Sequence, residues 1–495
     1  MTRAHSLTDR AFSAAKWNYL GNGTRVFSQF VVGLVLARLL GPEAFGIVAI
    51  GWLVIGIGRL FSDFGLSAAL IQMPELTERD IGFVSTAQVA VGGLLSLGGF
   101  FAAPYLADFF HKPDATGILR AITSLFIIQS FGQAATALLN RTLKSKLTQT
   151  ANVLSYLIGY IFIGIPCAYF GMKAWSLVAA QLVQSVLYSV MVAVFSGIKL
   201  RPFFSPDSPS IFKFGSKVIG ANLSSWGIVN LDSVIIGRLF SVADLGLYSR
   251  AMALVGTPVG AMTSSMQGVL FAACSRSQDN LQNIKKAYLG VARLLALGSL
   301  PIFVTAAVVP ETIVAGLYGH QWLAAAPLLP PLALAMPLHA LLAIAGPILM
   351  AIDKVGMELK AQLLTLLIMM PVLYFASRYS MVAVAWSVLF IYFVRWLVLI
   401  LAIRSALNLH FKELGVALFA PFVCSLMVAV PAWCINSLLV EVEAFHRLLA
   451  VILVSLFSLM ISTRLLGPTL FKGILREILV DGGRLPRVMS QWLRV

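Results

Sequence analysis

Four polar residues in an otherwise apolar stretch near the N-terminus have the types and spacing of a binding surface. Asn18, Asn22, Arg25 and Gln29 are four, three and four residues apart, so a helix places all four on one face. A guanidinium inside a membrane is costly unless it faces a cavity or a partner. We therefore predict that this face lines a hydrated cavity for a polar head group. The alternative is that these side chains bond neighbouring helices.

Two further arginines are predicted near the depth of Arg25. At about 1.5 Å per residue, Arg25 and Arg59 both lie about 20 Å below the outer ends of their helices, and Arg395 reaches a similar depth. Guanidiniums at one level suit a diphosphate, which arginine holds through paired hydrogen bonds. For Arg59 the alternative is an ion pair with Asp63, and for Arg395 it is extension toward the inner interface.

Membrane helices must position these residues. The chain has 495 residues, of which 59% are apolar and 11% are charged, whereas soluble domains are about 45–50% apolar and about 25% charged. This composition excludes a soluble enzyme and predicts an all-α, polytopic membrane protein with about 14 transmembrane helices. The predicted helices cover 17–40, 45–70, 82–107, 117–139, 150–170, 174–196, 212–239, 250–272, 287–309, 325–350, 359–377, 380–403, 415–437 and 447–466.

The distribution of basic residues predicts the topology. With the N-terminus inside, most of the 36 Lys and Arg residues fall in cytoplasmic segments. The outer loops then hold only Lys112, Lys173, Arg378 and Arg447. Both termini are therefore predicted to be cytoplasmic. The net charge of +16 indicates contact with anionic lipid rather than with nucleic acid.

The chain contains an internal repeat at an offset of 200 residues. Residues 35–47 align without gaps on residues 235–247, and Gly46 then matches Gly246. Six predicted helices precede the second copy, so the two copies enter the membrane in the same orientation, as parallel repeats. The predicted regions are a six-helix lobe at 1–200, a second six-helix lobe at 201–410, two extra C-terminal helices at 411–466 and a basic cytoplasmic tail at 467–495.

The seventh predicted helix carries a second polar face, which contains Asn222, Ser225 and Asp232. If the two lobes are related by pseudo-twofold symmetry, this face and the face around Arg25 line the same central cleft. Trp322 is expected in the aromatic belt at the membrane interface.

The segments LARLLGPEAFG (36–46), FSDFGLSAALIQ (61–72), LDSVIIGRLFSVADLGLYSRA (231–251) and YGHQWLAAAPLL (318–329) carry a family resemblance. The sequence resembles the polysaccharide (Wzx-type) flippases of the multidrug/oligosaccharidyl-lipid/polysaccharide exporter superfamily. The resemblance implies that the chain moves a polyprenyl-diphosphate-linked oligosaccharide, such as an exopolysaccharide or O-antigen repeat unit, across the bacterial inner membrane. The implied direction is from the cytoplasmic to the outer face, by alternating access.

The resemblance also implies that basic residues in the cavity of the N-terminal lobe contact the diphosphate or acidic sugars. The predicted substrate-binding residues are Arg25, Arg59, Asn22, Gln29, Asn222, Asp232 and Arg395. Asp63 and Asp232 are candidates for ion coupling, and for Asp232 a salt bridge between the lobes and sugar binding are equally open. The expected partners are the lipid-linked oligosaccharide, membrane lipids and other polysaccharide-assembly proteins.

Other functions would require features that the sequence lacks. The sequence contains no phosphate-binding loop and no catalytic or metal-binding motif, so we expect neither an enzyme nor a cofactor or metal. A polysaccharide polymerase or ligase is expected to have a large outer catalytic loop, but the longest predicted outer connection is only about residues 310–325. The alternatives within transport are a peptidoglycan-precursor flippase and a drug or cation exporter of the same superfamily. A cation exporter predicts a cavity rich in carboxylates.

Overall fold

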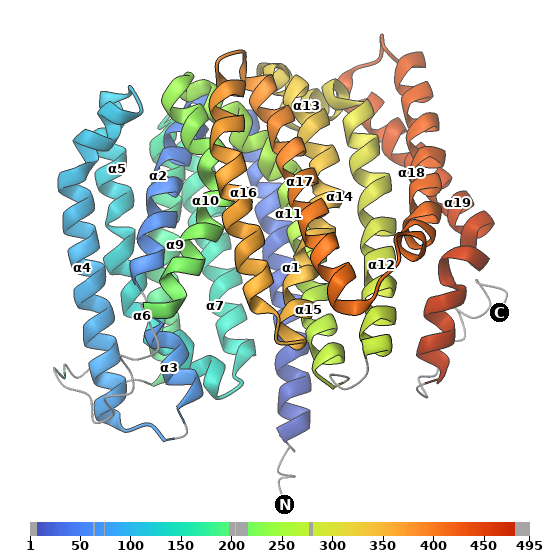
Figure 1. Cartoon of the computed structure of the whole chain (residues 1–495). Helices are drawn as coiled ribbons and strands as arrows, with labels where there is room; N and C mark the ends of the chain where they lie inside the picture. The colour runs from blue at the N-terminus through green and yellow to red at the C-terminus, as the bar shows by residue number, and fades with distance from the viewer. Residues whose placement is uncertain are drawn as a thin grey trace, which may run out of the picture. The chain divides into compact units, whose positions relative to one another are not determined.

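The protein consists of long helices joined by short turns (Figure 1). The computed structural model describes residues 7–62, 65–73, 75–197, 203, 216–276 and 281–480. Within these residues, eleven helical segments are long and apolar enough to cross a membrane. The chain is therefore a polytopic α-helical membrane protein, as its composition predicts.

The chain divides into two compact units, Met1–Ser249 and Arg250–Val495. The helices of the first unit are α1 (Leu7–Leu39), α2 (Pro42–Ser62), α3 (Leu66–Gln72), α4 (Glu78–Phe109), η1 (Pro113–Ala115), α5 (Thr116–Thr123), α6 (Leu125–Arg141), α7 (Ser145–Leu157), η2 (Ile158–Gly164), α8 (Ile165–Tyr169), α9 (Ala174–Ser196) and α10 (Ser216–Leu239). Helix α11 (Val242–Arg276) begins in the first unit and continues into the second.

The second unit contains the remaining helices. These are α12 (Leu281–Val308), α13 (Pro310–Tyr318), η4 (His320–Leu328), α14 (Leu329–Ala343), α15 (Ala345–Ala351), α16 (Val355–Ser377), α17 (Met381–Leu407), α18 (Phe411–Leu438) and α19 (Ala444–Val480). Helix α18 packs between α12 and α19, and α17 packs between α14 and α16.

The predicted number of fourteen crossings is not confirmed. Three further long helices, α1, α10 and α11, have 33, 24 and 35 residues, but they are not among the eleven apolar segments. Helices α1 and α10 carry the two predicted polar faces, and polar residues lower the hydropathy of a segment. Fourteen crossings and the division into lobes at residue 200 stay predictions.

Several predicted boundaries and one predicted environment are wrong. The helix predicted at 45–70 ends at Ser62, and α3 begins separately after Gly65, whose φ of +72° is in the left-handed region that favours glycine. The helix predicted to end at 466 continues to Val480, because apolar residues recur there at helical spacing. Trp322 is fully buried against Tyr318, with ring centroids 5.7 Å apart, so it is not a residue of the interface belt.

The internal repeat is visible in the structure of the first unit. Helices α1 and α10 end at Leu39 and Leu239, and α2 and α11 begin at Pro42 and Val242, so both breaks share the offset of 200.

The aligned glycines also meet in space. A Cβ atom on Gly46 would overlap the carbonyl oxygen of Val242, and a Cβ atom on Gly246 would overlap the carbonyl oxygen of Pro42. Each copy of the repeat therefore contacts the other through equivalent residues, as a pseudo-twofold axis requires.

A second set of contacts joins α2, α4 and α10 beside this crossing. The ammonium of Lys112 lies 2.6 Å from the carboxylate of Glu43, which raises the pKa of the lysine and keeps it charged. Arg238 donates a hydrogen bond to the carbonyl of Phe109, the last residue of α4, at 2.5 Å. The contact of Arg238 satisfies a carbonyl at a helix end that lacks a partner within its own helix.

Candidate functional site

Arg25 lies on α1 at the centre of a polar cluster in the first unit. Its Nη1 donates a hydrogen bond to the Oδ1 of Asn152 on α7 at 3.5 Å. The Nε of Arg25 is buried and has no hydrogen-bond partner among the described residues. The single contact is long, so the guanidinium retains most of its capacity to bind an anion.

Arg59, on α2, belongs to the same cluster. Its Nη2 donates to the Oε1 of Gln129 on α6 at 3.2 Å. Arg59 is close enough to Arg25 for the two positive charges to repel each other. The structure therefore brings together the two N-terminal arginines that were predicted to lie at one depth.

Further hydrogen bonds between neutral polar side chains join the helices of these arginines to α6 and α7, which pack against them. Gln149 on α7 donates to Asn18 on α1 at 3.1 Å. Gln133 on α6 donates to Ser62 on α2 at 3.5 Å, and the Oε1 of Gln133 is buried without a partner among the described residues. Among the described residues, the cluster thus joins the helices of the two arginines to two further helices, α6 and α7, through amides rather than through carboxylates.

Our prediction missed the contributions of α6, α7 and α9. Gln129, Gln133 and Thr136 repeat at helical spacing on α6, which is the same signal that identified the polar face of α1. Thr136 hydrogen-bonds the hydroxyl of Tyr188 on α9 at 3.1 Å, and the charge of Arg25 acts on this tyrosine. The spacing was available in the sequence, but the packing of these helices onto α1 and α2 was not.

For the other predicted residues of the first unit, the structure gives only the helix or the exposure, or nothing at all. Asn22 is exposed on α1, and Gln29 is half-buried on the same helix. Asn222 belongs to α10, but its side chain lies outside the described residues, and Asp63 lies outside them altogether. The alternative of an ion pair between Arg59 and Asp63 stays open for that reason.

Asp232, on α10, is buried, and both of its carboxylate oxygens accept hydrogen bonds. The hydroxyl of Tyr248 on α11 donates at 2.5 Å, and the backbone N–H of Ser233 donates at 2.6 Å. These bonds stabilise the carboxyl group locally, and its predicted roles in substrate binding or ion coupling stay untested.

Arg395 forms an ion pair in the second unit. Its Nη2 lies 3.5 Å from the Oε1 of Glu358, which joins α17 to α16. Gln362, one turn after Glu358, donates to the same oxygen at 3.2 Å. The sequence gives no spacing signal for Glu358 as a partner of Arg395, because the two residues lie in different helices.

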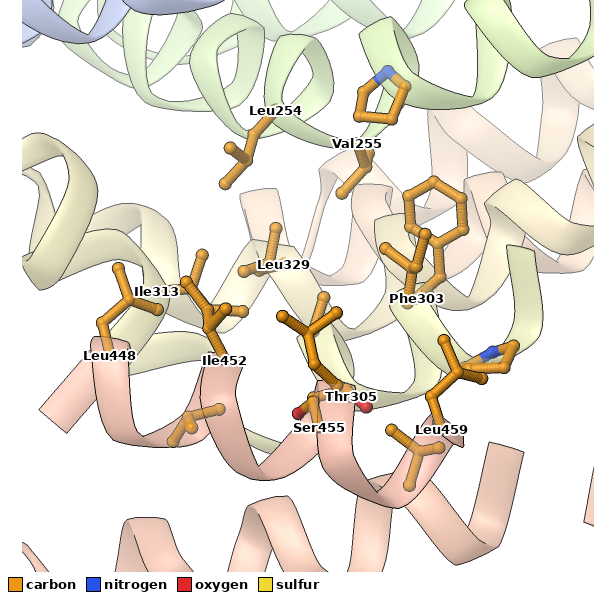
Figure 2. A pocket seen from close by; sticks show the side chains of 17 residues that line it. Leu254, Val255, Phe303, Thr305, Ile313, Leu329, Leu448, Ile452, Ser455 and Leu459 are labelled. Atoms are coloured by element: carbon orange, nitrogen blue, oxygen red, sulfur yellow. The ribbon is translucent and has the colours of Figure 1, made fainter. Parts of the chain in front are cut away.

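A separate cavity in the second unit is almost entirely apolar (Figure 2). It has a volume of about 280 Å³ and lies between α11, α12 and α19, with Leu254, Phe303 and Leu459 among the side chains that line it. Thr305 and Ser455 supply its side-chain hydroxyls, and both are buried without a partner among the described residues. None of the predicted binding residues lines this cavity, whose surface suits a lipid chain rather than a sugar.

The described residues contain no group of three or more His, Cys, Asp or Glu side chains that could hold a metal ion. The polar cluster in the first unit combines two guanidiniums with amides and hydroxyls. Such a set of groups can bind an anion and hydroxyl-bearing sugars.

Comparison with known proteins identifies the family. Residues 35–327 match the family described as "Polysaccharide biosynthesis protein". The chain belongs to this family. This finding confirms the resemblance to Wzx-type flippases.

Three relatives are named for the biosynthesis of different products. The chain is 26% identical to the teichuronic acid biosynthesis protein TuaB of Bacillus subtilis, over 70% of this chain and 72% of TuaB. It is 21% identical to the lipopolysaccharide biosynthesis protein WzxC of Escherichia coli, over 88% of this chain and 89% of WzxC. It is 26% identical to the succinoglycan biosynthesis transport protein ExoT of Rhizobium meliloti, over 64% of each chain.

Solved structures show the same fold at low sequence identity. The lipid II flippase MurJ in an inward closed conformation superposes with a TM-score of 0.73 at 13% identity, over 94% of this chain and 100% of MurJ. An inward-facing multidrug resistance MATE transporter superposes with a TM-score of 0.59 at 17% identity, over 77% of this chain and 94% of the transporter. This member of the polysaccharide biosynthesis family therefore has the fold of the MurJ and MATE transporters.

Proposed function

We propose that this protein is a flippase, not an enzyme, and that its substrate is a polyprenyl-diphosphate-linked oligosaccharide. It moves this lipid from the cytoplasmic to the outer face of a bacterial inner membrane by alternating access. The names of TuaB, WzxC and ExoT support a surface polysaccharide as the final product, and ExoT is named a transport protein. Other polysaccharide-assembly proteins are the proposed partners.

The observation that carries this proposal is the pair of guanidiniums, Arg25 and Arg59, held close together by neutral side chains. In the part of the chain that the structure describes, both guanidiniums donate to neutral amides, those of Asn152 and Gln129. An uncompensated positive charge among membrane helices is costly, and an anionic head group offsets that cost. The proposed head-group site consists of this pair together with Asn22 and Gln29, while Asn222 and Asp232 contribute from α10. Arg395, in the second unit, is proposed to bind substrate by itself.

The same observation weighs against a cation exporter, because two like charges at the site repel cationic drugs. The connection at 310–325, where a polymerase or ligase would need a large catalytic loop, contains only α13 and most of η4.

Transport in a purified system tests the proposal. Vesicles that contain the protein should move a fluorescent polyprenyl-diphosphate oligosaccharide between leaflets, whereas protein-free vesicles should not. Cells depleted of the protein should accumulate the lipid-linked oligosaccharide on the cytoplasmic face of the membrane. Export of a cationic drug without movement of the lipid would instead identify a drug exporter.

The proposed topology has its own test. Glu441 lies in the connection between α18 and α19, Lys286 lies near the start of α12, and both are exposed. In a variant without native cysteines, an impermeant thiol reagent added to cells with a permeabilised outer envelope should label Glu441→Cys but not Lys286→Cys. Labelling of Lys286→Cys before the inner membrane is opened would contradict the cytoplasmic termini.

A further inference from the structure

The ion pair between Arg395 and Glu358 has poor geometry for a permanent structural contact. Its single N···O contact is 3.5 Å long, although the exposed fractions of the two side chains are only 16% and 18%. The Nε of Arg395 and the Oε2 of Glu358 are buried, and neither has a hydrogen-bond partner among the described residues. A pair shielded from water repays its desolvation only when its remaining polar atoms are also bonded.

The two atoms without partners belong to groups of opposite charge. One is a donor on the guanidinium, and the other is an acceptor on the carboxylate. The Oε1 of Glu358 already accepts from Gln362 and Arg395, so the Oε2 is the oxygen that is available to a proton. The Nε of Arg395 is available to a second oxygen of an incoming anion.

The predicted position of Glu358 near the cytoplasmic end of α16 places these atoms where a lipid diphosphate can reach them. Glu358 lies in the first turn of α16, which the predicted topology places at the cytoplasmic side, within about 5 Å of the end of the helix. A lipid diphosphate in the cytoplasmic leaflet lies at this depth, because its charged oxygens stay near water. Arg395 reaches toward this level from the middle of α17.

We propose that Arg395 exchanges the carboxylate of Glu358 for the lipid diphosphate when the substrate binds, and that Glu358 then binds a proton. This inference rests on the proposed function, and it adds the coupling of substrate binding to a proton. In the resting state Arg395 donates to the carboxylate. When the diphosphate arrives, the guanidinium transfers its hydrogen bonds to phosphate oxygens, and the Oε2 of Glu358 takes one proton from the cytoplasmic water. No uncompensated carboxylate then remains inside the protein.

Positive charge faces Glu358 from its own helix and from α17. The positive end of the α16 dipole acts on a carboxylate in the first turn. His339 on α14 lies within electrostatic range of Arg395 and contacts the ring of Tyr392 on α17, with centroids 5.4 Å apart. The other charged groups of α16, of the turn before it and of α17 are Asp353, Lys354, Lys360 and Arg404. When Arg395 leaves, the carboxylate loses its ion-pair partner.

Calorimetry of the purified full-length protein with undecaprenyl diphosphate tests this exchange. Titrations at about pH 8, where a phosphate with a second pKa near 6 is ionised, are repeated in buffers of different ionisation enthalpy. The dependence of the heat on the buffer counts the protons taken up. We expect about one proton per bound lipid for the wild type and about none for Glu358→Gln.

Glu443→Gln is the matched control. Glu443 is 72% exposed and pairs with His446 at 3.1 Å, so its replacement should leave proton uptake as in the wild type. Binding without proton uptake by the wild type, or unchanged uptake by Glu358→Gln, would overturn the inference and leave the proposed function intact. Failure of the wild type to bind the lipid would overturn the proposed function, and the exchange with it.

The wild type alone also decides the question if Glu358→Gln does not fold. Uptake of one proton makes the Kd for undecaprenyl diphosphate rise about tenfold per pH unit over the range in which Glu358 exchanges its proton. A Kd that is constant between about pH 7 and 9, where the phosphate no longer titrates, would overturn the exchange.

Discussion

Arg25→Ala protein is expected to insert into the membrane and accumulate, yet to move lipid-linked oligosaccharide at least about 100-fold more slowly than the wild type. Hydrogen bonds to charged groups are worth about 1.5–3 kcal/mol each, so the loss of a paired contact to phosphate accounts for a factor of this size. The wild-type side chain has one long contact in the described structure, to Asn152. Its removal should therefore lower the stability of the fold little and weaken substrate binding.

Two comparisons separate binding from folding. Arg25→Lys should recover part of the activity, because the charge is retained but the planar fork is lost. Arg120→Ala is the control, because Arg120 is an exposed arginine of the same unit whose guanidinium lies 4.5 Å from the ring of Phe100, and this variant should flip lipid normally. The measurement is leaflet exchange in vesicles with equal amounts of protein. Normal flipping by a well-folded Arg25→Ala protein would contradict the cationic site.

Gly246→Ala is expected to lower the stability of the protein by about 1–3 kcal/mol, as for other substitutions that overfill a packed contact. The added methyl group would overlap the backbone of Pro42 and Gly46, which cannot rotate away as a side chain can. The measurement is thermal or denaturant unfolding of the protein in one fixed detergent. Gly46→Ala should have a similar effect, because its methyl group would overlap the backbone of Val242.

Gly256→Ala is the matched control on the same helix, α11. A Cβ atom at Gly256 would meet nothing within 4 Å, so alanine should leave stability unchanged or raise it by about 0.5–1 kcal/mol. The double variant of Gly46 and Gly246 adds a test of reciprocity. Once one methyl group has separated the two helices, the second should cost less, so the two effects should not be additive. Strict additivity would contradict a single shared crossing.

The sequence by itself determined the class of protein and much of its chemistry. An apolar content of 59% leaves no folded state in water for a chain of this length, so the membrane helices follow from composition. The polar face of α1 follows from spacing, because the helix period is fixed by the backbone. The repeat at an offset of 200 predicted the equivalence of Gly46 and Gly246, and the structure shows that these two glycines meet at one crossing.

Only the tertiary structure decided which residues become partners. Gln129 and Asn152 reach the arginines from α6 and α7, and Glu358 reaches Arg395 from a neighbouring helix. Spacing along one helix says which face a residue occupies, but not which helix covers that face. Trp322 shows the same limit. A tryptophan side chain suits the membrane interface, but the packing of α13 against η4 buries this one. Pairing between helices depends on packing across the whole unit, and no local pattern in the sequence records that packing.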